Sequence, residues 1–173
     1  NSKTAGSAMT LIAGGSPVNP AAVSISSNTI TNNTMAGGGA AATLLCITMA
    51  GTSTYTVNSN TVNNNSVTGM TGAAIATLSG FSNSGGTQNE TISGNKFSNL
   101  FVTGTSTGLQ VVRGIHNNTT GTSTRTVSQD TIFNLYTSSA MSAVVTGINS
   151  QLGGNTTISR NWIYNLFPGQ SAT

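Results

Sequence analysis

One short pattern occurs five times along the chain and constrains its fold more than any other feature. The copies lie in VSISSNTITNN, TVNSNTVNNN, TISGNKFSNL, TVSQDTIFNL and TISRNWIYNL. The first asparagine-type position recurs at intervals of 32, 35, 35 and 31 residues, at Asn28, Asn60, Asn95, Asp130 and Asn161. A repeat of this length indicates one supersecondary unit per copy, stacked on its neighbours.

Further columns keep their chemistry in every copy. Three residues before the first asparagine stand Ile25, Val57, Ile92, Val127 and Ile158. Two residues after it stand Ile30, Val62, Phe97, Ile132 and Ile163. Four residues after it stand Asn32, Asn64, Asn99, Asn134 and Asn165, and the last three copies then add Leu100, Leu135 and Leu166. Chance matches in an asparagine-rich chain would not place these columns at the same spacing in all five copies.

The spacing of the two apolar columns predicts a bend. They are five residues apart, so one straight strand would place them on opposite faces. Both face one interior only if the chain turns between them, and asparagine tolerates the left-handed conformation that such a turn needs. We therefore expect a strand, a bend at the first asparagine and a second strand. The period fits a three-sided coil with a variable loop.

The second asparagine lies two residues after an apolar position, which predicts that it also faces inward. A buried amide is costly unless it is hydrogen-bonded. In stacked coils each amide can bond to its copies about 4.8 Å above and below. The ten aligned positions are therefore predicted to form asparagine ladders: Asn28, Asn60, Asn95, Asp130, Asn161, Asn32, Asn64, Asn99, Asn134 and Asn165.

A second, weaker block follows the first four motifs, in ATLLCITMAG, AIATLSGFSN, LQVVRGIHNN and AVVTGINSQ. Three of these blocks carry glycine before an apolar residue, at Gly80, Gly114 and Gly147, and the first has Cys46 there. Threonine-rich, β-branched segments with glycine and asparagine turns are typical of strands. No long 3.6-residue pattern supports a helix. The sequence therefore predicts an all-β fold.

The columns in ISRNWIYNL and ISGNKFSNL resemble right-handed parallel β-helix repeats. Such repeats occur in pectate-lyase-like proteins and in large secreted bacterial surface proteins. The resemblance covers about residues 23–167 and implies a right-handed parallel β-helix, or β-solenoid, of about five coils at an extracellular or cell-surface location. It is not specific for function, because the fold carries polysaccharide-cleaving enzymes, adhesins and structural repeats.

The 173 residues suit a single β-solenoid domain, with a partial first coil in 1–22, repeat coils in 23–167 and a tail in 168–173. Ser7–Gly15 resembles the second block without a preceding motif, and the last motif lacks a following block. Tail joined to head would read as one further repeat. We therefore expect copies to stack head to tail, or the chain to be a window of a longer repeat protein.

Charged residues make up only 4% of the chain, against about 25% in ordinary globular proteins. The apolar runs are far shorter than the ~18–20 residues of a spanning helix, so no membrane span is predicted. A hydrophobic content of 36% argues against disorder. Nucleic acid is not expected as a partner, since the five cations are scattered: Lys3, Lys96, Arg113, Arg125 and Arg160.

The chain contains only two acids, Glu90 and Asp130. Glycoside hydrolysis normally needs two carboxylates about 5–10 Å apart, and Ca²⁺ usually needs several oxygen ligands. Alignment places Glu90 one rung from Arg125, which predicts an inter-rung ion pair, and places Asp130 in the first asparagine column. We therefore expect no catalytic residue, no metal site and no cofactor. The lone His116 is expected in a loop and Cys46 in packing.

Two surface interpretations remain open. Phe101, Tyr136 and Phe167 follow the leucine column and either cover the edge of the core or form a sugar-stacking strip. Thr-x-Thr arrays, such as 52/54/56 and 122/124/126, resemble ice-binding faces. However, the arrays fall in different parts of the repeat, and GGTQNET and GGNTT are expected to interrupt any rank of threonines.

The sequence thus favours a structural extracellular protein whose partners are copies of itself, stacked into a surface fibre. A carbohydrate-binding adhesin segment, with surface polysaccharide as partner, is the alternative. An ice-binding protein and a polysaccharide lyase or hydrolase are less favoured.

Overall fold

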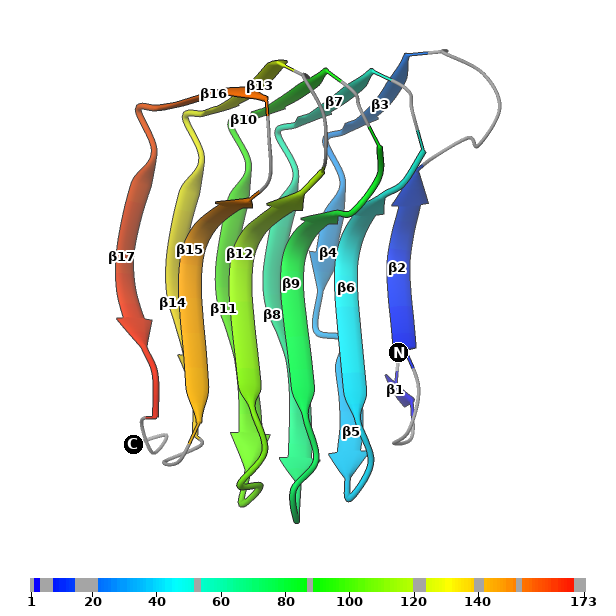
Figure 1. The fold of residues 1–173 in the computed structure, drawn as a ribbon, viewed down its shortest axis with the longest axis vertical. Coiled ribbons are helices and arrows are strands. Elements are labelled where there is room, and N and C mark those ends of the chain that lie inside the picture. Colours follow the sequence, from blue (N-terminus) through cyan, green and yellow to red (C-terminus); the bar gives the residue numbers. More distant parts are fainter. Residues whose placement is uncertain are drawn as a thin grey trace.

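A computed structural model describes residues 2–3, 8–14, 22–51, 54–86, 89–119, 124–138, 142–151 and 154–169. These residues form a parallel β-solenoid of about four turns, and none of them is helical (Figure 1). Hence no described segment is a helix that could cross a membrane. The all-β fold predicted from the repeat is confirmed.

Three parallel sheets make the sides of the coil. The short sheet contains β3 (Val23–Ser26), β7 (Tyr55–Asn58), β10 (Glu90–Ser93), β13 (Thr124–Ser128) and β16 (Asn155–Ser159). The long sheet contains β1 (Ser2–Lys3), β4 (Thr29–Thr31), β5 (Thr34–Gly38), β8 (Thr61–Met70), β11 (Lys96–Gly104), β14 (Thr131–Thr137) and β17 (Trp162–Phe167). The return sheet contains β2 (Ala8–Gly14), β6 (Ala42–Met49), β9 (Ala76–Asn83), β12 (Gln110–Asn118) and β15 (Ala143–Gln151).

Each rung runs from the short sheet to the long sheet and then to the return sheet. In Figure 1 the chain descends the long sheet, rises along the nearer return sheet and crosses the top, advancing from right to left. This path is right-handed, as parallel crossover connections almost always are. The strands align column by column, so that Ile92 stands between Val57 and Val127.

The first bend lies one residue earlier than the sequence pattern suggests. The left-handed residue is the one before each first asparagine, as at Gly94 (φ 64°) rather than Asn95. The other copies have Ser27, Ser59, Gln129 and Arg160 at this position. Asn95 itself is buried, because a turn completed before it directs its side chain into the coil. The prediction of a bend is confirmed, but its placement on the first asparagine is wrong.

The second asparagine column forms another bend. Asn32, Asn64, Asn99, Asn134 and Asn165 all adopt left-handed φ values between 51° and 59°. A left-handed residue interrupts the alternation of a strand, so Phe97 and Leu100 both face the interior although they are three residues apart. The expectation that Asn99 faces inward assumed unbroken alternation and is wrong. This side chain lies at the surface, half-buried.

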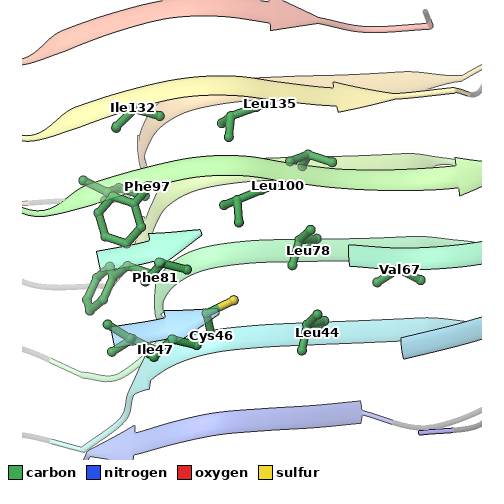
Figure 2. Packing of buried hydrophobic residues seen from close by; sticks show 14 of the residues in the cluster. Leu44, Cys46, Ile47, Val67, Leu78, Phe81, Phe97, Leu100, Ile132 and Leu135 are labelled. Carbon is green, nitrogen blue, oxygen red and sulfur yellow. The ribbon is translucent and has the colours of Figure 1, made fainter. Parts of the chain in front are cut away.

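The core is a stack of equivalent side chains from successive rungs. Ile92, Phe97 and Leu100 are buried as predicted, and Lys96 is exposed. Figure 2 shows Leu44 beside Leu78 and Ile47 beside Phe81 on neighbouring strands. Each apolar layer therefore continues the layer below it, and the apolar side chains form one cluster that extends through successive rungs.

Glycine in the second block allows the return sheet to bend tightly against its neighbours. A Cβ added at Gly114 would lie 2.6 Å from Ile132 Cγ2 and 2.7 Å from the carbonyl oxygen of Gly147. Gly80 stands in the same relation to Gly114, also at 2.7 Å. At Gly80 and Gly114, glycine is therefore a packing requirement between rungs, whereas the first copy has Cys46 in this column.

Candidate functional site

The first asparagine column forms a ladder, here called the inner ladder, that is buried at its three middle members and half-buried at its two ends. Its members are Asn28, Asn60, Asn95, Asp130 and Asn161. In Asn28, Asn60 and Asn95, the side-chain amide and the backbone N–H both donate to Oδ1 of the next member of the ladder, at 2.8–3.0 Å. Asp130 has no amide and donates only its backbone N–H to Asn161 Oδ1, at 2.9 Å.

The amides of Asn60, Asn95 and Asn161 also donate to the rung before them. The acceptor is the carbonyl oxygen three residues before the preceding asparagine, as in Asn95 Nδ2 to Val57 O at 2.9 Å. Asn60 and Asn161 make the same bond to Ile25 O and Val127 O. At Asn60 and Asn95 both amide hydrogens therefore have acceptors, which makes the burial of these two side chains tolerable.

The second asparagine column forms an outer ladder of opposite polarity. Here the later copy donates to the earlier one, as in Asn134 Nδ2 to Asn99 Oδ1 at 3.0 Å. Asn64 bonds to Asn32 and Asn165 to Asn134 in the same way. Asn99 departs from this pattern because its amide donates to Asn63 Oδ1, at 2.7 Å. These bonds lie on the partly solvated surface.

A third, short ladder was not predicted. Asn33 and Asn65 are buried where later copies have leucine, and Asn33 Nδ2 donates to Asn65 Oδ1 at 2.8 Å. Asn65 Nδ2 donates in turn to Ile30 O, at 3.0 Å. Only two of the five copies carry this asparagine, so it is weak as a repeat signal.

Glu90 and Arg125 are aligned on neighbouring strands of the short sheet, with 3.8 Å between Oε1 and Nε. The predicted inter-rung pair is thus present, but it is buried and not exposed. Burial raises the pKa of the Glu90 carboxyl, while Asn117, Arg125, Thr119 and Asn83 act in the opposite direction. A buried pair of this kind contributes little net stability unless its remaining hydrogen bonds are made.

Those hydrogen bonds come from the end of the return sheet and the loop after it. Asn83 Nδ2 donates to Glu90 Oε1 at 2.7 Å, and Asn117 Nδ2 donates to Oε2. Arg125 Nη2 donates to the carbonyl oxygen of Thr119 at 2.5 Å. The Glu90–Arg125 pair thus connects the short sheet to the end of the return sheet across two rungs.

The two acids lie in different parts of the coil. Glu90 belongs to the corner network, and Asp130 to the inner ladder. Both side chains are buried. No cluster of three or more His, Cys, Asp or Glu residues occurs in the part of the chain that the structure describes.

His116 lies within β12, not in a loop as the sequence suggested. It is half-buried on the outer face of the return sheet, three residues after Arg113. Partial burial lowers the pKa of His116, and the nearby Arg113 charge lowers it further. Cys46 is fully buried, as predicted, and burial raises the pKa of its thiol.

Aromatic residues gather on the outer face of the long sheet. Of the nine in the chain, Tyr55, Phe81 and Phe97 are buried in the core. The other six lie on β11, β14 and β17: Phe101, Phe133, Tyr136, Trp162, Tyr164 and Phe167. We call these six the aromatic face. The predicted strip is half of it, and Phe133, Trp162 and Tyr164 were missed because only some copies carry a ring there.

The rings of the aromatic face stack along the axis. Phe101 and Tyr136 have centroids 5.0 Å apart and an interplanar angle of 8°, and Phe133 and Tyr164 have values of 4.9 Å and 2°. Near-parallel rings at this distance are offset-stacked, with their faces turned toward each other. Phe167 is aligned with Tyr136 in the next rung. This geometry favours an aromatic ladder that covers the sheet.

The outer face of the short sheet is lined by hydroxyl groups. One continuous column runs through all five strands: Ser24, Thr56, Thr91, Thr126 and Thr157. The expectation that GGTQNET and GGNTT interrupt the Thr-x-Thr rank is confirmed in one column, where Asn155 stands beside Thr124. It is wrong in the other column, where Thr91 and Thr157 stand on either side of Thr126. Loop length varies before these strands, so spacing along the sequence did not show the alignment.

Comparison of the chain with protein-family models, curated proteins and solved structures gave no match. Of the predicted resemblance, the structure shows the parallel β-solenoid fold.

Proposed function

We propose that this chain is a structural β-solenoid subunit that stacks head to tail on copies of itself into an extracellular or cell-surface filament. The observation that carries the proposal is an uncovered core at the last rung. Ile158 is 51% exposed, whereas Val127 in the same column is 1% exposed. Ile163 is 39% exposed, whereas Ile132 in its column is fully buried.

A further rung of the same kind fits this end. The described strands β15, β16 and β17 leave one edge of each sheet unpaired by the described strands of this chain. At the opposite edges lie β2, β3 and, in the long sheet, β1 and β4. All neighbours within the coil are parallel, so a second copy in the same orientation continues each sheet. Fully burying one isoleucine side chain stabilises by about 1.5–3 kcal/mol.

Charge opposes this contact very little. The net charge is +3 over 173 residues, so repulsion between copies is weak. Head-to-tail contacts between identical surfaces that do not close into a ring produce filaments. The ring of Tyr164, stacked on Phe133, and the ring of Phe167 lie on the last strand, where a following rung would cover them. We assign no catalytic residue, cofactor or metal to this function.

The test is molar mass measured by light scattering over a concentration series. The wild-type mass should rise with concentration, and Ile163→Lys should move the onset to at least about 10-fold higher concentration, because a charge would have to be buried. Thr91→Lys adds the same charge to an exposed position on a middle rung and should assemble as wild type. A wild-type mass that stays monomeric throughout contradicts the proposal.

A second candidate function, binding of surface polysaccharide, is favoured by one residue of the aromatic face. Trp162 is 71% exposed and tilted by 55° from Tyr164, so its ring is not stacked in the ladder. Such a ring offers a free apolar face to a sugar. Sedimentation with insoluble polysaccharide would test it: binding that is lost in Trp162→Ala but kept in Phe101→Ala supports the candidate, and no binding contradicts it.

A further inference from the structure

Asp130 carries a carboxyl group at a position of the inner ladder where the other four members carry an amide. At every other inner rung with a preceding copy, the amide nitrogen donates to the carbonyl oxygen of the rung before. The amides of Asn28, Asn60 and Asn95 also donate to Oδ1 of the rung after. The equivalent acceptors around Asp130 are Ile92 O and Asn161 Oδ1.

Asp130 Oδ2 takes the place of that amide nitrogen. It is buried and has no hydrogen-bond partner, while Oδ1 accepts from Asn95 N and Nδ2 at 2.8 and 2.9 Å. An ionised Oδ2 would turn a negative oxygen toward two acceptor oxygens. A proton on Oδ2 would convert it into a donor that satisfies one of them.

We propose that Asp130 is protonated on Oδ2 in the folded solenoid at mildly acidic pH, and that the loss of this proton lowers the stability of the coil as the pH rises. This places a pH-sensitive rung in the buried ladder, independent of whether copies stack. Its basis is the donor and acceptor pattern of the neighbouring rungs.

Burial supports this assignment, since it raises the pKa of Asp130 from 3.8 to about 6 even though the Asn95 bonds act in the opposite direction. The folded state therefore binds more protons than the unfolded chain between these two values. By linkage, the contribution of Asp130 to stability is fully present below about pH 4 and is lost as the pH rises through about 6.

Other ionisable groups surround this rung without sharing the ladder position. Those on the neighbouring strands and bends are Glu90, Lys96, Arg113, His116, Arg125, Tyr136, Arg160 and Tyr164. Glu90 pairs with Arg125, Lys96 and Arg160 are exposed, and Arg113 and His116 lie on the outer face of the return sheet. None contributes a charge effect to the pKa of Asp130, whose causes are burial and Asn95.

The experiment compares wild type with Asp130→Asn by urea unfolding from pH 4 to pH 8. Asparagine restores the amide of the other rungs, and contributions from Glu90 and His116 cancel in the comparison. The variant should match or exceed wild type at pH 4. The ratio of the folding equilibrium constant of the variant to that of wild type should increase by about 100-fold between pH 4 and pH 8, because the pKa of Asp130 differs by about two between the folded and unfolded chains.

The reverse substitution is Asn60→Asp, which puts a carboxyl at an equivalent buried rung. It should destabilise the chain near pH 8 and cost much less near pH 4. The carboxyl carbon of Asp130 can also be titrated directly by ¹³C NMR in the wild-type chain. A midpoint well above 3.8 supports the proposal. A titration midpoint at or below 3.8 overturns it. A ratio of the folding equilibrium constants of wild type and Asp130→Asn that does not change with pH also overturns it.

Discussion

At the scale of single residues, the two asparagine columns do different work although they look alike in sequence. The inner asparagines are buried and use their amides between rungs. The outer ones hold a left-handed backbone conformation at the surface. Asparagine suits both tasks, because it has two amide donors and one carbonyl acceptor and also tolerates positive φ.

This difference predicts unequal mutational costs at Asn95 and Asn99. Asn95→Ala removes the acceptor of Asn60 and the donor to Val57 O in a buried place, so we expect a loss of about 3–5 kcal/mol in unfolding free energy. Asn99→Ala should cost about 1–2 kcal/mol, mainly for alanine at positive φ. Asn99→Gly relieves that strain and serves as the control. Equal losses at both sites in urea titrations would contradict the assignment.

Residue patterns predicted the buried columns but not every orientation. Ile92, Phe97 and Leu100 could be assigned to the core because all or most copies are apolar there. The bend residue could not be found, because Ser27, Ser59, Gly94, Gln129 and Arg160 share no chemistry. The inward orientation of Asn99 was wrong for the same reason, since a left-handed residue breaks the alternation on which the prediction depended.

At the scale of elements, strands of one sheet are held at the separation that their backbone bonds impose, and side chains must fit that separation. The return sheet bends at the glycine column, where the backbones of successive rungs approach closely. A Cβ at Gly114 would meet both Ile132 and the carbonyl oxygen of Gly147. At Gly147 the three atoms nearest to the added Cβ would all be side-chain atoms of Ile163, the closest at 2.6 Å.

Gly114→Ala should therefore destabilise more than Gly147→Ala. Backbone cannot move without displacing a whole rung, and overpacking typically costs about 1–3 kcal/mol or more. Ile163 on the last rung can change rotamer, so the loss at Gly147 should be smaller. Thermal unfolding followed by circular dichroism at equal protein concentration gives the comparison. The reverse order of melting temperatures would show that the close approach between rungs does not limit the sheet.

Contacts between elements were also the hardest to predict. Glu90 and Arg125 could be paired from the repeat interval, but their burial could not, because Asn83, Asn117 and Thr119 come from outside the motif. The hydroxyl column of the short sheet escaped notice because loops of different lengths precede Thr91 and Thr157. Register in space depends on strand pairing, which spacing along the sequence does not give.

At the scale of the whole molecule, the solenoid repeats along one axis, so its stability depends on contacts between neighbouring rungs. The last described rung lacks a neighbour on one side and leaves Ile158 and Ile163 uncovered. A second copy would supply that neighbour with the same parallel geometry that operates inside the chain. Assembly is therefore proposed as an extension of the fold itself.

Electron cryomicroscopy of concentrated wild-type protein tests this claim most directly. Our account predicts unbranched filaments with a ~4.8 Å axial rung spacing that continues across the junction between copies. Their cross-section should match a single coil, with the aromatic face on the outside. Dispersed particles one chain long at every concentration, or filaments whose rungs do not continue across the junction, would contradict it.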